Sequence, residues 1–230
     1  TTLHISRQSS THYKITYRIT MKHTESILTA LRTEVIHLAS NIHGITPYGH
    51  SELEAAIDKV LPRWLVRHEP ENEPSFKQLI PYCVIRKRDK FLTYARAKGS
   101  GEERLLGNRS VGFGGHVDED EEVEDTTNSG LIGYAAAREL EEEIGLQDKD
   151  VLKAFAAGVI NNDKDEVGKV HLGILIQFEV ADSWEPTQLE AGVADLKWQT
   201  IDELFETSES YEVWSQMIIS HTERMLVSKR

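Results

Sequence analysis

The amino-acid sequence predicts an α+β fold in which helices pack against a mixed β-sheet. Strand-like segments stand on both sides of one strongly helical segment at residues 131–144, and another helical segment follows late in the chain. The chain has 230 residues, which is enough for one domain of ordinary size with some residues left over. We therefore expect one α+β sandwich domain with additional elements outside it.

The first third of the chain is expected to be mainly helical. Residues 13–19 alternate between apolar and polar types and predict a strand. An apolar stripe predicts a helix over residues 25–41, which Gly44 could help to end. A short second helix is indicated by a capping box of Ser51 with Glu54. The proline-bracketed polar stretch 70–74 then gives the best candidate for a boundary, between residues 75 and 76.

The rest of the chain is expected to place extended segments around one helix. We expect extended segments at residues 79–86, 91–95, 110–117, 152–161, 170–180 and 195–199. The first two form a β-hairpin, and a polar turn is expected at residues 162–169. Gly145 should close the helix at 131–144, and a capping box of Thr200 with Glu203 should begin the C-terminal helical region.

Composition indicates a globular protein of the cytoplasm. Hydrophobic residues make up 39% and charged residues 28% of the chain. The longest apolar runs fall far short of the roughly 20 residues that span a bilayer. The single cysteine, Cys83, excludes an internal disulfide framework, and its apolar neighbours indicate a packing residue.

The net charge of −12 argues against nonspecific binding of a nucleic-acid duplex, which needs clustered basic side chains. Much of the excess lies in the acidic run at residues 118–125, which is typical of a solvated loop. An acidic enzyme that acts on an acidic substrate needs metal cations between the two. Metal dependence is therefore a reasonable expectation.

A cluster of carboxylates on the helix at 131–144 carries the chemical signal. Glu139, Glu142 and Glu143 fall within a sector of about 100° on a helical projection. Three carboxylates so placed repel one another without cations, and Mg²⁺ accepts such oxygen ligands together with phosphates. Taken alone, the cluster is better explained as a solvated glutamate face, which is common on surface helices.

The wider pattern resembles the Nudix box. The box consists of Gly, five residues, Glu, seven residues, Arg-Glu, an aliphatic residue, any residue, Glu-Glu, any residue, Gly and an aliphatic residue. The matching positions are Gly115, Glu121, Arg138, Glu139, Leu140, Glu142, Glu143, Gly145 and Leu146. The resemblance covers residues 76–207. It implies a Nudix-like α/β/α sandwich with a mixed sheet, preceded by an N-terminal strand and helical extension (1–75) and followed by a C-terminal helix packed on the domain (208–230).

One departure from the box is an insertion. Sixteen residues separate Glu121 from Arg138, where the family has seven. The nine extra residues are polar and typical of a loop, which can bulge without disturbing the helix. Glu124 is therefore an alternative to Glu121 for the first glutamate of the box.

The resemblance implies a role for each matching residue. Glu142 and Glu143 would ligate Mg²⁺ or Mn²⁺, Glu139 would be a further ligand or the base that activates water, and Arg138 would orient a neighbouring glutamate. The backbone at Gly115 would lie close to the metal. A downstream carboxylate often completes the site in this family; our candidate is Glu190, with Glu185 and Glu166 as rivals.

The implied activity is hydrolysis of a diphosphate linkage in a nucleoside diphosphate joined to another group. The substrate would thus be a small nucleotide-type molecule rather than a duplex or a membrane. Arg96, Arg104, Arg109 and His116 are candidates for binding its phosphates. Residues 103–116 resemble a little-characterised subgroup of predicted phosphoesterases, which names no substrate. Homodimers are common in the family, so a homodimer is a further expectation.

Two other functions remain open from the sequence. One is an enzyme similar to isopentenyl-diphosphate isomerase, which shares the fold; Cys83 lacks the surroundings expected for that activity. The other is a binding module that senses nucleotides without cleaving them, against which the complete set of carboxylates argues.

Overall fold

The computed structural model describes residues 26–40, 43–98, 105–119 and 127–227, and the backbone alone for residues 225–227. One mixed sheet forms its centre, with the strand order β10-β5-β4-β9-β8-β2. In the same order these strands span Val193–Thr200, Lys90–Arg96, Phe76–Lys87, His171–Val180, Val151–Asn162 and His43–Pro47. Strands β4 and β9 run parallel and the other pairs along this path run antiparallel, which confirms the mixed sheet.

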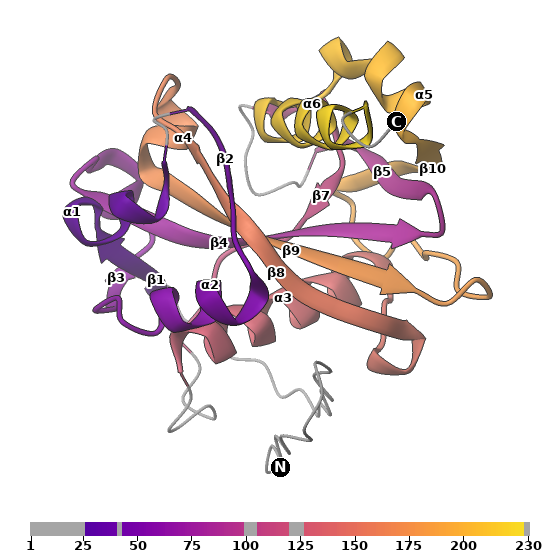
Figure 1. Ribbon diagram of the computed structural model, residues 1–230. Coiled ribbons are helices and arrows are strands. Elements are labelled where there is room, and N and C mark those ends of the chain that lie inside the picture. Colours follow the sequence, from indigo (N-terminus) through magenta and orange to yellow (C-terminus); the bar gives the residue numbers. More distant parts are fainter. Residues whose placement is uncertain (1–25, 41–42, 99–104, 120–126, 228–230) are drawn as a thin grey trace.

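Helices cover both faces of the sheet, as Figure 1 shows. Helix α3 (Asn128–Ile144) lies against one face, and helices α5 (Ile201–Glu206) and α6 (Val213–Val227) lie against the other. Alternation along β4 supplies both cores: Cys83 belongs to the core that contains α3, and Tyr82 belongs to the core that contains α5 and α6. The predicted α+β sandwich is confirmed.

The predicted helix at 131–144 is confirmed. It begins slightly earlier, at Asn128, where the side chain of Thr127 accepts a hydrogen bond from the backbone N–H of Gly130 at 3.2 Å. It ends at Gly145, whose φ of 69° is readily adopted only by glycine. Leu140 and Ile144 are buried in the core, and Glu139, Glu142 and Glu143 lie on a neighbouring face that lines the pocket.

The predicted hairpin is also confirmed, and its strands soon diverge. Strands β4 and β5 pair only at Arg86–Phe91 and Lys87–Lys90. Farther along, β7 (Gly112–Phe113) pairs with β4 at Cys83 and Val84, and β6 (Arg109–Ser110) pairs with β5. The divergence opens the sheet at the level of the glycine-rich segment.

The helix expected over residues 25–41 is wrong. Residues Ser26–Leu31 form strand β1, and only Arg32–Val35 (α1) and Ile36–Leu38 (a 3₁₀ turn) are helical. Strand β1 pairs with β3 (Arg63–Val66) and with β4, so all four central residues of β1 are buried. Because pairing on both edges satisfies the backbone, tertiary contacts override the helical appearance of the segment.

Residues 26–75 are therefore built into the main sheet rather than forming a mainly helical extension. Helix α2 (His50–Ile57) confirms the second expected helix, but the capping box is wrong, because Gly49 precedes the helix and Ser51 lies inside it. The predicted strand at 13–19 lies outside the described residues. The divisions at 75/76 and 207/208 remain predictions.

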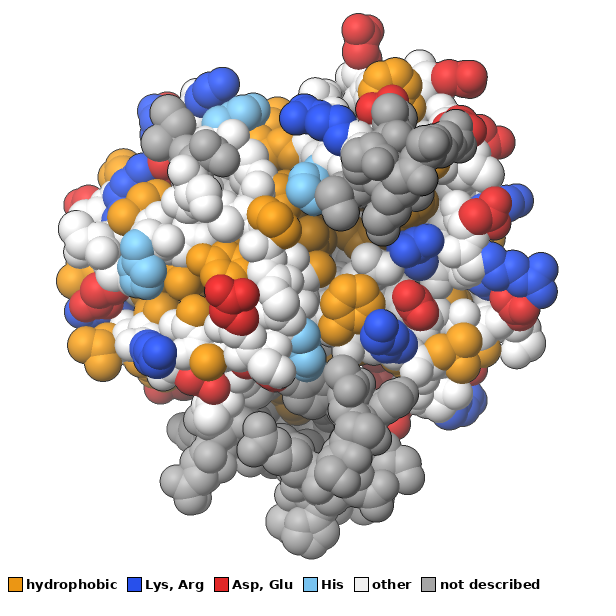
Figure 2. Space-filling view, viewed as in Figure 1, with side chains coloured by type: hydrophobic (Ala, Val, Ile, Leu, Met, Phe, Trp, Pro, Cys, Tyr) orange, Lys and Arg blue, Asp and Glu red, His pale blue; other side chains and the backbone are white. Residues whose placement is uncertain are grey.

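The remaining elements follow the sequence closely. The capping box of Thr200 with Glu203 is present at the start of α5. The expected turn between β8 and β9 contains one short helix, α4 (Glu166–Val170). Among the described residues, no helix is long and apolar enough to cross a membrane. On the face seen in Figure 2, basic and acidic side chains of the described residues are interspersed.

Candidate active site

A pocket of about 1310 Å³ opens where β4 and β5 diverge. It is larger than the few hundred to roughly 1,000 Å³ of an ordinary small-molecule site. Its walls come from β4, β5, the glycine-rich loop after β7, α3, α4 and the start of α6. The predicted box residues Gly115, Arg138, Glu139, Glu142 and Glu143 all line it, so segments far apart in sequence meet at one site.

The glycine-rich loop lies directly against β4 and α3. Gly114 has a φ of 139°, and a Cβ there would clash with the carbonyl oxygen of Pro81. A Cβ on Gly115 would lie 2.5 Å from Oε1 of Glu139. Since neither position has room for a side chain, the backbone can approach the carboxylates closely.

Arg138 organises the acidic side chains around it. The Arg138 guanidinium is buried, and its Nη1 lies 2.9 Å from Oε1 of Glu139 and 3.1 Å from Oε2 of Glu142. Its Nη2 lies 3.3 Å from Oδ2 of Asp118 and donates a hydrogen bond to the carbonyl oxygen of His116 at 3.0 Å. The arginine therefore holds α3 and the glycine-rich loop together.

Burial perturbs two of the glutamates strongly. Burial first, and repulsion from Glu142 and Asp118 next, raise the pKa of Glu139 to about 7 despite the attraction of Arg138. Burial and the repulsion of Glu139 raise the pKa of Glu143 to about 8, although the Gly114 backbone hydrogen bond lowers it. Such a site favours added positive charge.

The donor set fits a hard divalent cation. Oε1 of Glu142 and Oε2 of Glu143 are buried and have no hydrogen-bond partner. Carboxylate oxygens beside a loop that excludes a Cβ suit Mg²⁺ or Mn²⁺. Within the described ranges, no three His, Cys, Asp or Glu side chains are already arranged around one metal position, because Glu139 and Glu142 turn toward Arg138. Binding would require these carboxylates to reorient.

Other predicted residues are distributed differently. Glu190 is exposed at the pocket, and its charge raises the pKa of Glu139 and Glu143. Glu166 also lines the pocket, on α4, and pairs with Lys169. Glu185 instead pairs with Lys87 at 2.5 Å, in a part of the structure that does not line the pocket.

The four predicted phosphate-binding residues separate into three groups. Arg96 and His116 line the pocket. Arg109 does not line it: its Nη1 lies 2.6 Å from Oδ2 of Asp195 and thereby ties β6 to β10. Arg104 lies outside the described residues, as do the two alternatives for the first box glutamate, Glu121 and Glu124.

Arg96 is the basic group best placed for an anion. Its guanidinium carbon lies 5.6 Å from the centre of the Tyr94 ring, and its Nε is buried without a hydrogen-bond partner. Its charge acts on Glu143 by lowering the pKa of that carboxyl, so the two side chains are close. A phosphate at this position could accept a hydrogen bond from this Nε, which has no partner among the described protein groups.

The start of α6 contributes residues that the sequence did not single out. Glu212 and Trp214 line the pocket, and Oε2 of Glu212 accepts a hydrogen bond from the Trp214 backbone N–H at 2.8 Å. The Trp214 ring packs edge-on against Tyr82, with 5.4 Å between ring centres. An acidic residue before a helical stretch signals a helix start, but only the packing of α6 on the sheet brings it to the pocket.

Comparison with known proteins identifies the family of this chain. The family model described as the NUDIX domain matches residues 79–217. Protein YmaB of Bacillus subtilis (strain 168) is 34% identical over 171 residues, which are 74% of this chain and 82% of that protein.

Two solved structures share the fold. Tm1382, a candidate Nudix hydrolase, has a TM-score of 0.71 and 22% identity, over 87% of this chain and 99% of that one. DR0079 of Deinococcus radiodurans has a TM-score of 0.50 and 12% identity, over 78% and 97%. At these identities the two likenesses concern the fold alone. Because the NUDIX model covers more than half of the sequence, the chain belongs to the Nudix family of hydrolases, and five residues of the box line one pocket.

Proposed function

We propose that this enzyme cleaves the diphosphate linkage of a nucleoside diphosphate joined to another group, with Mg²⁺ or Mn²⁺ as its cofactor. The observation that carries the proposal is the buried carboxylate cluster of Glu139, Glu142 and Glu143, two of whose oxygens have no partner. Three crowded carboxylates with one arginine between them are costly for a purely structural role, because the cluster is only partly compensated. Its position in a pocket of about 1310 Å³ favours a catalytic role.

Each residue of the cluster has its own role in the proposed reaction. Glu142 and Glu143 would hold the cation, with Glu190 as an auxiliary ligand. Arg138 keeps Glu139 and Glu142 in place. A divalent cation bound here would neutralise charge on the diphosphate and acidify a water molecule. Glu139 serves either as a further ligand or as the base that accepts the proton of the attacking water.

The substrate is held by groups beside the carboxylates. Arg96 binds oxygens of the diphosphate, because its guanidinium faces the pocket near Glu143. His116 contributes through its neutral ring: burial lowers its pKa to about 3, so we assign it hydrogen bonding rather than charge attraction. Arg104 remains a further candidate for phosphate binding.

The test is metal-dependent turnover of a panel of nucleotides. Purified protein is incubated with nucleoside diphosphate sugars, nucleoside triphosphates and isopentenyl diphosphate, with and without Mg²⁺ or Mn²⁺, and phosphate-bearing products are identified. Cleavage of a diphosphate only with metal supports the proposal. Isomerisation of isopentenyl diphosphate would support the isomerase alternative, and nucleotide binding without any turnover would support a sensor.

We also propose that the protein is located in the cytoplasm and forms a homodimer. The one cysteine is buried and unpaired, as suits a reducing compartment. Light scattering at micromolar concentration tests the oligomeric state, since a monomeric mass would contradict the homodimer.

A further inference from the structure

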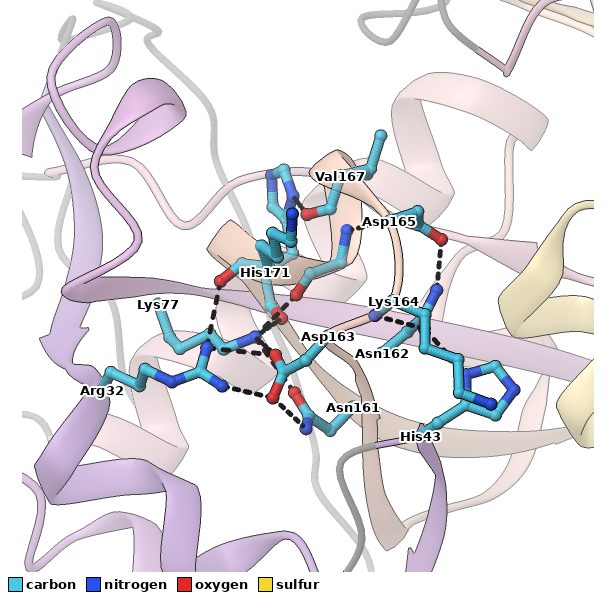
Figure 3. Close-up of polar contacts among 12 residues, drawn as sticks. Arg32, His43, Lys77, Asn161, Asn162, Asp163, Lys164, Asp165, Val167 and His171 are labelled. Atoms are coloured by element: carbon cyan, nitrogen blue, oxygen red, sulfur yellow. Dashed lines mark hydrogen bonds and ion pairs between the residues drawn. The ribbon is translucent and has the colours of Figure 1, made fainter.

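A buried lysine fixes the connection between β8 and β9. Lys77, on β4, is fully buried. Its Nζ lies 2.8 Å from Oδ1 of Asp163 and donates to Oδ1 of Asn161 at 3.0 Å, to the carbonyl oxygen of Gly168 at 2.6 Å and to that of His171 at 3.1 Å. Figure 3 shows Asn161, Asp163 and His171 around the Lys77 side chain. A buried charge is tolerated only with such compensation, so the connection is firmly held to β4.

Further polar contacts hold the residues between β8 and β9 in place. Nη1 of Arg32 donates to Oδ1 of Asp163 at 3.0 Å, which adds a second cation to the carboxylate (Figure 3). Oδ1 of Asp165 accepts from the Gly168 backbone N–H at 2.6 Å and so caps α4. A Cβ on Gly168 would clash with the carbonyl oxygen of Asn162. The position of α4 is therefore set by these polar contacts rather than by apolar packing alone.

This connection is a wall of the active-site pocket. Residues 165–168 and His171 line the pocket together with His116. The His116 and His171 rings lie 6.0 Å apart, and Nε2 of His116 lies 2.8 Å from Oε1 of Gln78, the neighbour of Lys77. The His116 carbonyl in turn accepts from Arg138. One framework thus connects the wall to the catalytic carboxylates.

The charges at the two ends of the pocket differ. At the α4 end, Arg67 lines the pocket and pairs with Glu71 at 3.2 Å. Arg138, among the carboxylates of α3, pairs with Asp118, Glu139 and Glu142. Among the described contacts at the other end, the guanidinium of Arg96 has no carboxylate within ion-pair distance. A phosphate is therefore favoured beside Arg96, and an uncharged group beside α4.

The spacing of the two ends suits a two-part substrate. Gln78 contacts His116, and Tyr82 packs on Trp214, so both ends of the pocket are anchored on β4. Four residues of a strand span about 13 Å, and side chains four apart point to the same face. Imidazoles and carboxylates at the α4 end offer hydrogen bonds to hydroxyl groups.

We propose that the wall made by residues 165–168, His171 and His116 binds an uncharged, hydroxyl-bearing group of the substrate, and that the Lys77–Asp163 pair positions this wall. The preferred substrate is then a nucleoside diphosphate joined to a sugar-type group rather than a nucleoside triphosphate. This inference rests on the proposed function, because the sugar-type group belongs to the same diphosphate substrate. Lys77 and Asp163 act as positioning residues and do not contact the reacting atoms.

The experiment compares two probes that share adenosine, namely ADP-ribose and ATP. Their affinities are measured by calorimetry with Mn²⁺ in the full-length protein and in its Asp163→Asn variant, and their kcat and KM are measured where turnover occurs. We expect wild-type protein to bind ADP-ribose at least about tenfold more tightly than ATP. In Asp163→Asn the KM for ADP-ribose should rise about tenfold with little change in kcat, while the affinity for ATP should stay the same.

Two further variants serve as independent tests and controls for the role of the wall. Val167→Phe adds volume to the wall without touching Lys77 or Asp163, and it should weaken ADP-ribose binding selectively even if Asp163→Asn fails to fold. Arg88→Ala removes an exposed ion pair with Asp182 at the hairpin tip, away from the pocket, and should behave as wild type.

The possible outcomes separate this inference from the proposed function. Tighter binding of ATP than ADP-ribose, or an equal effect of Asp163→Asn and Val167→Phe on both probes, would overturn the wall as a sugar-binding element. A protein that discriminates between the probes as expected but hydrolyses no diphosphate would retain the wall and refute the proposed activity.

Discussion

The backbone of Gly115 lies so close to Glu139 that a Cβ on Gly115 would stand 2.5 Å from Oε1 of that carboxylate. Real Cβ atoms essentially never approach an oxygen this closely, so one of the two must move. Glu139 is also held by Arg138 at 2.9 Å, which limits where its carboxylate can go. The glycine and the glutamate therefore constrain each other across the pocket.

Replacement of Gly115 by alanine should impair catalysis more than folding. The new methyl group would displace the Glu139 carboxylate from its position beside the glycine-rich loop. A misplacement of about 1 Å in a catalytic group can cost about a hundredfold in rate. We expect a fall in kcat of about that size with a two-state thermal melt preserved, as measured by steady-state kinetics and circular dichroism.

Gly133→Ala is the matched control. Gly133 lies within α3, and a Cβ there would meet nothing within 4 Å. Because alanine favours helix, the variant should be about 0.5–1 kcal/mol more stable than wild type and fully active. Equal activity of the Gly115→Ala and Gly133→Ala variants would show that the close approach at Gly115 has no catalytic importance.

Divalent metal should stabilise the folded protein. Mg²⁺ or Mn²⁺ bound by Glu142 and Glu143 favours the folded state by mass action, by about 2.7 kcal/mol when the metal concentration is 100 times Kd. We expect saturating metal to raise the Tm of wild-type protein and to have a much smaller effect on Glu142→Gln. Identical melting curves with and without metal in both proteins would exclude a metal site here.

The metal-free protein should lose stability as the pH rises. The pKa of Glu139 is about 7 and that of Glu143 about 8 in the folded state, against 4.5 in the unfolded chain, chiefly because of burial. Below about pH 4.5 both states hold these protons and no stability is lost. As the pH rises toward 8, the unfolded chain releases them first, so folding becomes less favourable.

Thermal melts in EDTA from pH 5 to 8.5 measure this effect. The Tm of wild-type protein should fall across that range more steeply than that of Glu143→Gln, which cannot ionise at this position. Parallel curves for the two proteins would mean that Glu143 is not held in an environment that disfavours its charge.

The fold could be read from the sequence where local pattern and tertiary packing agree. Helix α3 combines a periodic apolar face, a capping threonine and a terminal glycine, so its identity did not depend on distant contacts. Strand β1 shows the opposite case. Its apolar run resembles a helical stripe, and only pairing with β3 and β4, more than thirty residues away, makes it a strand.

The same distinction applies to the site. Gly115 and the three glutamates of α3 belong to one recognisable sequence pattern, so their convergence could be expected despite the insertion between them. Trp214 and His171 reach the pocket through the packing of α6 and the buried contacts of Lys77, for which a single sequence gives no signal. Arg96 and Arg109 were equal candidates, and the structure separates them because Arg96 lines the pocket whereas Arg109 pairs with Asp195.

Arg96 should contribute to substrate binding through its charge and its planar shape. Arg96→Met keeps the length of the side chain but removes the guanidinium that faces the pocket. Loss of a charge-assisted hydrogen bond of about 1.5–3 kcal/mol should raise KM roughly tenfold to a hundredfold. Arg96→Lys should restore only part of this, because an ammonium group cannot bind phosphate in a bidentate manner. Steady-state kinetics of all three proteins would decide, and an unchanged KM in Arg96→Met would exclude phosphate binding here.

Glu143→Gln gives the most direct test of catalysis. The substitution preserves side-chain volume but removes one negative charge from a buried cluster, where Oε2 of Glu143 has no partner. Loss of this metal ligand should cost several kcal/mol of activation free energy, or about a thousandfold in kcat. Folding should survive, and the metal-free variant should be more stable at neutral pH because the raised pKa of Glu143 no longer opposes folding.

Glu141→Gln is the control. Glu141 neighbours the cluster in sequence but does not line the pocket. Its carboxylate accepts a long hydrogen bond from Gln147 at 3.4 Å. It should keep nearly full activity. Both kcat values are measured on a substrate identified by the nucleotide panel. Comparable kcat values for Glu143→Gln and Glu141→Gln would contradict the mechanism. A negative charge removed from the pocket would then matter no more than one removed from outside the pocket on the same helix.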